Sequence, residues 1–322
     1  MIFIDRTESN PYFNIAAEEF VLRNINEDVL MLWESKDSVV LGKHQNAYAE
    51  LNYPYLIKNR IPVIRRISGG GTVFHGPGNL NITIIKTSTH DYGLIDFKEF
   101  TRPLIDFLSE SNIDAKFEGK NNLTIDGLKF SGNSAHIFKK RVLHHGTILF
   151  DVNLDTIDAI INESSDSFKD KAVKSIRANV TNLRPHLSDN TNYLIFKEKL
   201  KKHLFKHYNI SEVRTLTKFD KNEILQLMQE RYKSWDWNFG YSPMFTFENE
   251  VEWKGVNINC TLKIKNAIIQ EVELLNVGER KNIIEKNILN KKFSQQAITS
   301  ALNGTGLSFD EINVFLKLFQ LA

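Results

Sequence analysis

The apolar positions in the first half of the chain follow two spacings. Between strand-like runs at 2–5 and 29–33, apolar residues recur every three or four positions, which is typical of a helix with one buried face. Asn10 is suited to cap this helix and Pro11 to begin it, so we expect a helix from Pro11 to about Asn24. Further helices are expected at about 95–111, 154–162, 191–208 and 220–233, and further strands at 38–41, 61–67 and 80–86.

Hairpin signals dominate the middle of the chain. Asp126-Gly127 lies between two apolar runs, 123–125 and 128–130, and predicts a two-residue hairpin. A second hairpin is expected to join 135–138 to 149–152, with its turn near Lys139-Lys140-Arg141. Many strands joined by short turns predict an α+β fold with a mixed, largely antiparallel sheet flanked by helices.

The composition changes near Ser242-Pro243. Beyond this point, 245–275 has the pattern of a meander of strands, and helical segments follow at 279–289, 294–302 and 308–318. We therefore expect two domains, a larger one at 1–241 and a small α+β domain at 242–322.

Charge and composition mainly exclude other classes of protein. The chain has 322 residues, a formal net charge of +2 and no basic tail, so no binding to nucleic acid is expected. It has one cysteine, Cys260, which excludes an internal disulfide and is expected to serve packing. The first residues lack a signal-peptide pattern, and no apolar run approaches the roughly 20 residues that span a bilayer. A cytoplasmic protein without membrane attachment is therefore expected, and a monomer is expected because nothing in the sequence argues against one.

A run of three glycines is the strongest chemical signal. It lies within Arg65-Arg66-Ile67-Ser68-Gly69-Gly70-Gly71-Thr72-Val73-Phe74-His75. Glycine permits positive φ and lets a ligand approach backbone N–H groups, which together can hold an anion. The two arginines add charge suited to carboxylate or phosphate oxygens. The run fits neither a Rossmann fingerprint nor a P-loop, and a plain loop is the alternative interpretation.

Three later residues are candidates with ordinary alternatives. Lys129 is either a site residue or a solvated lysine beside a turn, and His75 is either a site residue or a histidine at the edge of the core. His145 opens a strand, where a structural role is the alternative. Its neighbour His144 is expected to be exposed.

These segments, taken in order, resemble the signature of the lipoate–protein ligases. The likeness spans nearly the whole chain, includes a C-terminal accessory domain of the bacterial type, and implies the biotinyl/lipoyl-ligase catalytic fold. The segments are the glycine stretch with Gly78-Asn79, Lys129-Phe130-Ser131-Gly132, His145-Gly146-Thr147-Ile148-Leu149, Ser175-Ile176-Arg177 with Val180-Thr181-Asn182, and Trp237-Asn238-Phe239-Gly240 with Ser242-Pro243.

The resemblance implies a reaction in two steps. Lipoate attacks the α-phosphate of ATP to give lipoyl-AMP and pyrophosphate, and a lysine of a lipoyl-carrier domain then attacks the anhydride. The implied acceptors are the glycine-cleavage H protein and the E2 subunits of 2-oxoacid dehydrogenases. Lys129 is the implied catalytic residue, and Arg66 either contacts the nucleotide or braces the loop. The implied contacts to ATP or lipoyl-AMP are Arg66, Gly71, Thr72, Val73, Phe74 and Lys129, and those to lipoate are Trp33, Arg65, Ser68, Gly70, His75, Lys129 and His145.

Two departures from the family's pattern concern carboxylates. The family has His-Asp where this chain has His75-Gly76, and Asn-Asp where it has Asn121-Asn122. A carboxylate beside a triphosphate commonly holds Mg²⁺, and neutral Asn122 is a weaker ligand than the expected aspartate. ATP and Mg²⁺ are the implied cofactors, with the metal ligands left unidentified. Two alternatives stay open, a lipoyl amidotransferase that needs no ATP and a non-catalytic carrier-binding protein.

Overall fold

The computed structural model describes residues 1–88, 95–162, 165–176, 178–187 and 191–322. Within them the chain forms two compact units, each built from several segments. The first comprises Met1–Lys43, Val63–Asp155 and Ile176–Lys233, and the second comprises His44–Pro62, Thr156–Ser175 and Ser234–Ala322. The second unit thus includes two segments that precede residue 242, and the division into 1–241 and 242–322 stays a prediction.

An eight-stranded sheet forms the centre of the first unit, in the order β12-β1-β2-β6-β10-β9-β8-β7. β1 pairs in parallel with both of its neighbours, and the other pairs are antiparallel. The predicted mixed, largely antiparallel sheet is therefore confirmed. The strands are β1 (Ile2–Asp5), β2 (Val29–Trp33), β6 (Asn79–Thr87), β7 (Lys116–Glu118), β8 (Asn122–Ile125), β9 (Leu128–Phe138), β10 (Arg141–Leu149) and β12 (Glu212–Thr215).

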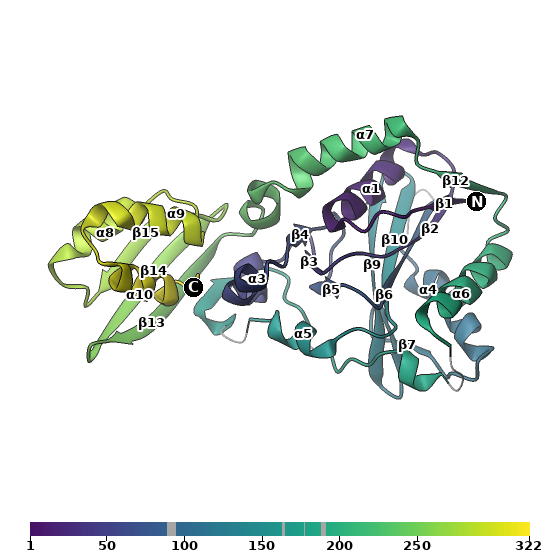
Figure 1. The fold of residues 1–322 in the computed structure, drawn as a ribbon, viewed down its shortest axis with the longest axis horizontal. Helices are drawn as coiled ribbons and strands as arrows, with labels where there is room; N and C mark the ends of the chain where they lie inside the picture. The colour runs from purple at the N-terminus through teal and green to yellow at the C-terminus, as the bar shows by residue number, and fades with distance from the viewer. Residues whose placement is uncertain (89–94, 163–164, 177, 188–190) are drawn as a thin grey trace. The chain divides into compact units, whose positions relative to one another are not determined.

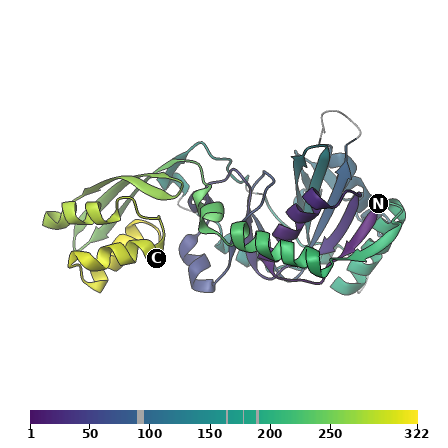
Figure 2. The ribbon, with the colours of Figure 1, turned by 90° about the horizontal axis from the view of Figure 1, so that it is seen from above.

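Helices cover both faces of this sheet (Figures 1 and 2). α1 (Pro11–Asn24) packs with α7 (Lys218–Leu227) on one face, and Asn10 caps α1 as predicted, accepting from two backbone N–H groups. α4 (Phe97–Ser109) and α6 (Tyr193–His207) bury their apolar faces against the other, where alternate residues of β2, β6 and β10 complete a core. Shorter elements are α5 (Leu154–Ala159), a 3-10 turn at Arg184–His186 and a π-helical turn at Met228–Tyr232.

A second, three-stranded sheet holds the glycine stretch. Its order is β4-β3-β5, with β3 at Ser38–Leu41, β4 at Val63–Arg65 and β5 at Val73–His75. The sequence predicted a loop running directly to the strand at 80–86, and this was wrong. The short strand β5 intervenes and pairs antiparallel with β3. A strand of this length lacks the run of alternating residues on which a prediction from sequence depends.

The predicted hairpin turn at Asp126-Gly127 is confirmed, with φ of +52° and +77° at its two residues. The second hairpin is only partly as predicted. β9 does end at Phe138, but β10 begins at Arg141, directly after the turn, and not at 149.

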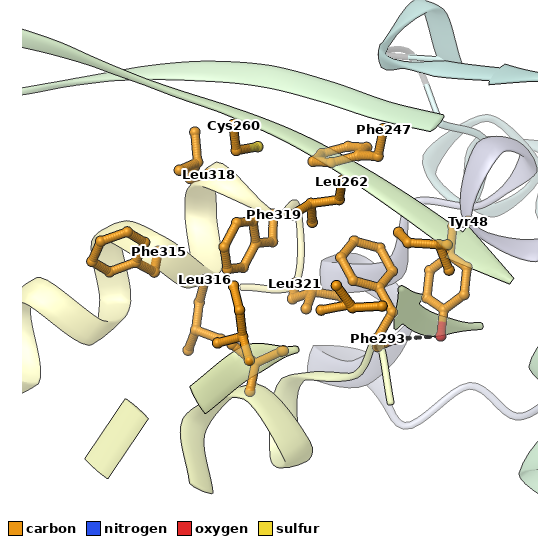
Figure 3. Close-up of a cluster of buried hydrophobic side chains, with 14 of the residues drawn as sticks. Tyr48, Phe247, Cys260, Leu262, Phe293, Phe315, Leu316, Leu318, Phe319 and Leu321 are labelled. Atoms are coloured by element: carbon orange, nitrogen blue, oxygen red, sulfur yellow. Dashed lines mark hydrogen bonds between the residues drawn. The ribbon is translucent and has the colours of Figure 1, made fainter. Parts of the chain in front are cut away.

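The second unit contains the antiparallel sheet β11-β13-β14-β15, and the predicted meander and its three following helices are confirmed. Figure 3 shows Phe247, Cys260, Leu262 and Phe319 within the cluster of buried apolar side chains that forms the core of this unit. Burial raises the pKa of the Cys260 thiol to about 12, in keeping with a packing role.

The elements of the second unit, in chain order, are α2 (Ala47–Glu50), α3 (Tyr53–Asn59), a 3-10 turn at Ser165–Ser167, β11 (Phe168–Asp170), a π-helical turn at Asp236–Gly240, β13 (Phe245–Trp253), β14 (Val256–Lys265), β15 (Ile268–Leu275), a 3-10 turn at Gly278–Arg280, α8 (Lys281–Ile288), α9 (Gln295–Leu302), a 3-10 turn at Asn303–Thr305 and α10 (Phe309–Leu318).

Tyr48 explains why the segment His44–Pro62 belongs to the second unit. Its ring lies among Phe239, Phe245 and Phe293, and its hydroxyl donates to the backbone carbonyl of Phe293 (Figure 3). Among the residues described, no helix has the length and apolar character needed to cross a membrane.

Gly78 ends the turn before β6 and has no room for a side chain. Its φ is +82°, and an added Cβ would lie 2.1 Å from the backbone oxygen of Asp151. Gly255 has a similar φ of +78° but no atom within 4 Å of that position. We expect Gly78→Ala to lower the free energy of unfolding by about 3 kcal/mol and Gly255→Ala by about 1 kcal/mol. Urea unfolding measures both, and equal losses would contradict the steric explanation.

Candidate functional site

One face of the large sheet carries a row of side chains across four strands. Directly paired residues point to the same face of a sheet. Trp33 pairs with Asn81, and Asn81 pairs with Thr147. The hydroxyl of Thr147 also accepts from the N–H of Gly132 on β9 at 3.4 Å. Trp33, Asn81, Thr147 and Gly132 are together called the first row. A neighbouring second row on the same face comprises Met31, Thr83, His145 and Ser134.

A β-bulge brings Lys129 onto this face. The β8–β9 register shifts between Leu123 and Thr124, which leaves Phe130 as an extra residue on β9. Phe130 is buried in the apolar core on the opposite face. A bulge re-aims the neighbouring side chain, and a Cβ built on Gly132 would lie 3.0 Å from both Cε and Nζ of Lys129. The ammonium group therefore lies over Gly132, at one end of the first row.

The surroundings of Lys129 do not support the interpretation as a solvated turn lysine. Its backbone N–H donates to the Asn179 carbonyl at 2.8 Å, and its own carbonyl accepts from Thr181 at 2.9 Å. Burial, and then the positive charge of Arg66, lower the pKa of Lys129. Its catalytic role stays a prediction.

Arg66 holds the glycine stretch from inside. It is buried, and a Cβ on Gly70, where φ is +85°, would approach its Nη2 at 3.1 Å. The structure thus supports bracing, the second of the two roles expected for this arginine, and its contact to a nucleotide stays a prediction. Burial lowers the pKa of Arg66 to about 10, partly offset by Glu18. Its guanidinium donates at 3.0 Å to the hydroxyl of Ser68 and at 3.0, 2.5 and 2.8 Å to the carbonyls of Val40, Gly69 and Gly71.

Arg65 lies on the other side of the same strand end. It is fully buried, and Nη1 donates to the carbonyls of Gly42 and Lys43, both at 3.1 Å. Its guanidinium group therefore binds the backbone that follows β3. Its predicted contact to lipoate stays a prediction.

A chain of buried hydrogen bonds joins the glycine stretch to the first row. Oγ of Ser68 lies 2.6 Å from Nε2 of His145, whose Nδ1 lies 3.0 Å from Oε2 of Glu18. Glu18 also accepts from the Thr83 hydroxyl at 2.5 Å, and Thr83 accepts from the indole N–H of Trp33 at 2.8 Å. Because a carboxylate only accepts, we assign the proton to Nδ1 of His145, which leaves Nε2 free to accept from Ser68.

Glu18, on α1, is the site residue that the sequence reasoning missed. Burial raises its pKa, but His145, the hydrogen bond from Thr83 and the charge of Arg6 outweigh burial, so that the pKa of Glu18 is lowered overall. No local signal marks Glu18, because Glu18 and Glu19 lie outside the predicted apolar face of α1, where polar residues are ordinary in a surface helix. Two successive glutamates at buried positions require partners in the folded protein.

His75 and Trp33 meet at the far end of the first row. Their rings form an edge-to-face contact with centroids 5.4 Å apart. Burial lowers the pKa of His75 to about 3, so this ring is neutral near pH 7. Both residues are predicted to contact lipoate, and they do lie side by side. The contacts to lipoate themselves stay predictions.

The expectation for His144 was wrong. Its side chain is buried on the core face of β10, stacked on Phe100 with ring centroids 4.6 Å apart. The alternation of β10 places it opposite His145, which faces the site. Among the described residues, neither nitrogen of His144 has a hydrogen-bond partner, and burial lowers its pKa to about 3.

The remaining predicted nucleotide contacts lie on β5 and just before it. Val73 and Phe74 pair with Val40 and Val39 of β3, whereas Thr72 lies outside the strand and is partly exposed. The structure therefore fixes this backbone next to the braced loop, and the contacts stay predictions. Arg177, part of the resemblance, lies outside the described residues.

The two positions where the family has carboxylates do not form a metal site. Gly76 has no side chain, and a Cβ there would lie 2.7 Å from Oδ1 of Asp37. Asn122 pairs with Gly132 and so lies near the Lys129 ammonium. Within the described ranges, no group of three or more His, Cys, Asp or Glu side chains could hold a metal ion. The ligands of Mg²⁺ therefore stay unidentified, and an ion bound mainly by the phosphates of ATP needs no such group.

Comparisons with known proteins point to one family. The model of the Lipoyl protein ligase A/B catalytic domain matches residues 10–205. The chain is 33% identical to Lipoate-protein ligase LplJ of Bacillus subtilis (strain 168), over 95% of each protein. The fold is similar to that of P. falciparum LipL1, solved in complex with lipoate, with a TM-score of 0.64, 24% identity and coverage of 99% and 98%. It is also similar to lipoate-protein ligase A bound with ATP, with a TM-score of 0.64, 21% identity and coverage of 74% and 98%.

The chain therefore belongs to the lipoate–protein ligase family. The predicted family and the predicted enzyme class, a ligase, are confirmed. The residue assignments within the site are not tested by these likenesses.

Proposed function

We propose that this chain activates lipoate with ATP and transfers the lipoyl group to a lysine of a lipoyl-carrier domain. Membership of the family supports this, because the relative LplJ is named a lipoate-protein ligase. The two structures of similar fold, one with lipoate and one with ATP, suggest both ligands for this chain. The glycine-cleavage H protein and E2 subunits are the proposed acceptors, and the cytoplasmic location stays a prediction.

The observation that carries this proposal is the first row itself. The Lys129 ammonium lies over Gly132 at one end, and the rings of Trp33 and His75 lie at the other. Three inter-strand spacings separate the strands at the two ends, which amounts to about 14 Å. An extended lipoate fits this length with its carboxylate at the lysine and its dithiolane ring at the aromatic pair. Aromatic side chains with a few convergent polar groups are typical of the lining of ligand sites.

In the first half-reaction, a carboxylate oxygen of lipoate attacks the α-phosphorus of ATP and pyrophosphate leaves. Lys129 is placed to bind the lipoyl carbonyl oxygen together with a phosphate oxygen, where negative charge develops. The loop that Arg66 braces from inside presents a rigid backbone for the adenylate. Mg²⁺ would be bound mainly by the phosphates of ATP, where it would neutralise their charge, and no step is assigned to it here.

In the second half-reaction, the neutral amine of the acceptor lysine attacks the lipoyl carbonyl carbon. The bond from that carbon to the phosphate oxygen breaks, AMP leaves, and the amine loses a proton as the amide forms. Lys129 stabilises the oxyanion of the tetrahedral intermediate. Its lowered pKa reflects an ammonium already partly removed from water, which strengthens that interaction.

Mass spectrometry of a carrier domain tests the proposal. We expect lipoate, ATP and Mg²⁺ together to add one lipoyl group to the apo H protein and release pyrophosphate. Modification that needs a lipoylated donor protein and no ATP would make the chain an amidotransferase. Carrier binding without transfer under either condition would leave a non-catalytic protein.

A further inference from the structure

Arg6 is a buried cation at the far end of the first row. It follows β1, the strand next to β2, and its side chain is almost fully buried. Its guanidinium carbon lies 5.2 Å from the centroid of the Trp33 ring. Trp33 is thus held by Arg6 on its face, by Thr83 at its N–H and by His75 at its edge.

Hydrogen bonds also fix Arg6 to the backbone around Trp33. Nη2 donates to the carbonyl of Asn14 at 3.2 Å and to its side-chain oxygen at 2.5 Å. The amide nitrogen of Asn14 donates in turn to the carbonyl of Glu34, the residue after Trp33, at 2.7 Å. One guanidinium group therefore orients both the indole ring and the chain that carries it.

The charge of Arg6 has its counterpart in Glu18. Glu18 favours the charged form of Arg6, and Arg6 favours the charged form of Glu18. Glu18 is also the residue that orients His145 and Thr83. Nε of Arg6 is buried without a hydrogen-bond partner among the described residues. Buried charges that are incompletely satisfied are weak support for stability, so the contacts of Arg6 with Trp33 and Asn14 indicate a role at the site.

We propose that Arg6 is a positioning residue that sets the selectivity of the site for lipoate over octanoate. This inference rests on the proposed function. Both acids reach from Lys129 toward Trp33, but only lipoate ends in a ring with two sulfur atoms. Sulfur–aromatic contacts depend on the placement of the aromatic ring, and together they are worth up to about tenfold in affinity. Without Arg6 the Trp33 ring is no longer held in one orientation, so lipoate loses these contacts. The flexible end of octanoate can still pack against the displaced ring.

Isothermal titration calorimetry of the full chain with lipoate and with octanoate tests the proposal. Arg6→Met keeps the length of the side chain and removes its charge, and Arg6→Lys restores a charge without the fork. Arg23→Met is the matched control, because Arg23 lies over the ring of Phe138 at 4.2 Å, away from the first row. We expect Arg6→Met to weaken lipoate roughly tenfold and octanoate at most about twofold. Arg6→Lys should recover part of the preference, and Arg23→Met should leave it unchanged.

The outcomes separate the inference from the function on which it rests. Equal weakening of the two acids in Arg6→Met, or an unchanged preference, overturns the role of Arg6 while the ligase proposal stands. A wild-type protein that binds neither acid overturns both. Urea unfolding of each variant accompanies the titrations, and a loss of stability alone does not change a ratio of two affinities measured on the same folded protein.

Discussion

Lys129→Met is expected to lower lipoyl transfer at least about a hundredfold while leaving the fold intact. The size follows from the loss of a single preorganised charge at the developing oxyanion, which typically costs about 10²–10³ in rate. The fold should survive, because the Lys129 side chain lies over a glycine and has no ion-pair partner among the described residues. Transfer to the carrier domain is followed by mass spectrometry under single-turnover conditions.

Lys86→Met is the matched control for this prediction. Lys86 lies near the end of β6, in the same sheet, and pairs on the surface with Glu99 at 2.8 Å. It should keep the wild-type rate and lose less than about 1 kcal/mol of stability. Near-normal transfer by Lys129→Met would remove the central residue of the mechanism. An unfolded Lys129→Met protein, shown by circular dichroism, would contradict the placement of that lysine at the edge of a site.

The elements that the sequence predicted well are those with a long regular pattern or a specific turn. α1 was predicted from its cap to its last residue because Asn10 and Pro11 mark the start and the apolar spacing marks the face. The turn at Asp126-Gly127 needed two residues with positive φ, and these residue types supply them. The glycine stretch was identified by a similar argument about backbone freedom.

The parts that were missed depend on contacts between distant segments. Nothing near Phe130 in the sequence marks a bulge, because the bulge is a property of the pairing with β8. His144 and His145 have the same side chain, yet the alternation of β10 sends one into the apolar core and the other to Glu18. Glu18 looked like an ordinary helix residue until α1 was placed over the sheet. Local sequence therefore identified the residues that lie in a distinctive motif, and tertiary pairing decided which of them meet and which further residues join them.

His144→Phe is expected to stabilise the protein and to weaken its loss of stability in acid. At neutral pH the substitution removes two buried ring nitrogens that lack partners, which should raise the free energy of unfolding by about 1–2 kcal/mol. The phenyl ring keeps the stacked contact with Phe100. The larger effect comes from protonation, because burial holds the pKa of His144 at about 3 in the folded protein, compared with about 6.5 in the unfolded chain.

The direction of the acid effect follows from which state binds the proton. Between about pH 6.5 and pH 3 the unfolded chain takes up a proton at residue 144 and the folded protein does not. Each such histidine therefore lowers stability by about 1.4 kcal/mol per pH unit as the pH falls through that range. His75, whose pKa is also lowered by burial to about 3, contributes in the same way in both proteins and cancels in the comparison.

Urea unfolding of wild type and His144→Phe at several pH values between 7 and 4 measures this difference. We expect the advantage of the variant to grow by roughly 1 kcal/mol per pH unit once the pH is below 6. His207→Phe is the control, since His207 is exposed at the end of α6. It should show no such growth. An advantage of His144→Phe that stays constant with pH would mean that the folded protein admits a proton at His144. The ring would then have access to water or an unassigned acceptor, and the apolar packing around it would have to open to provide it.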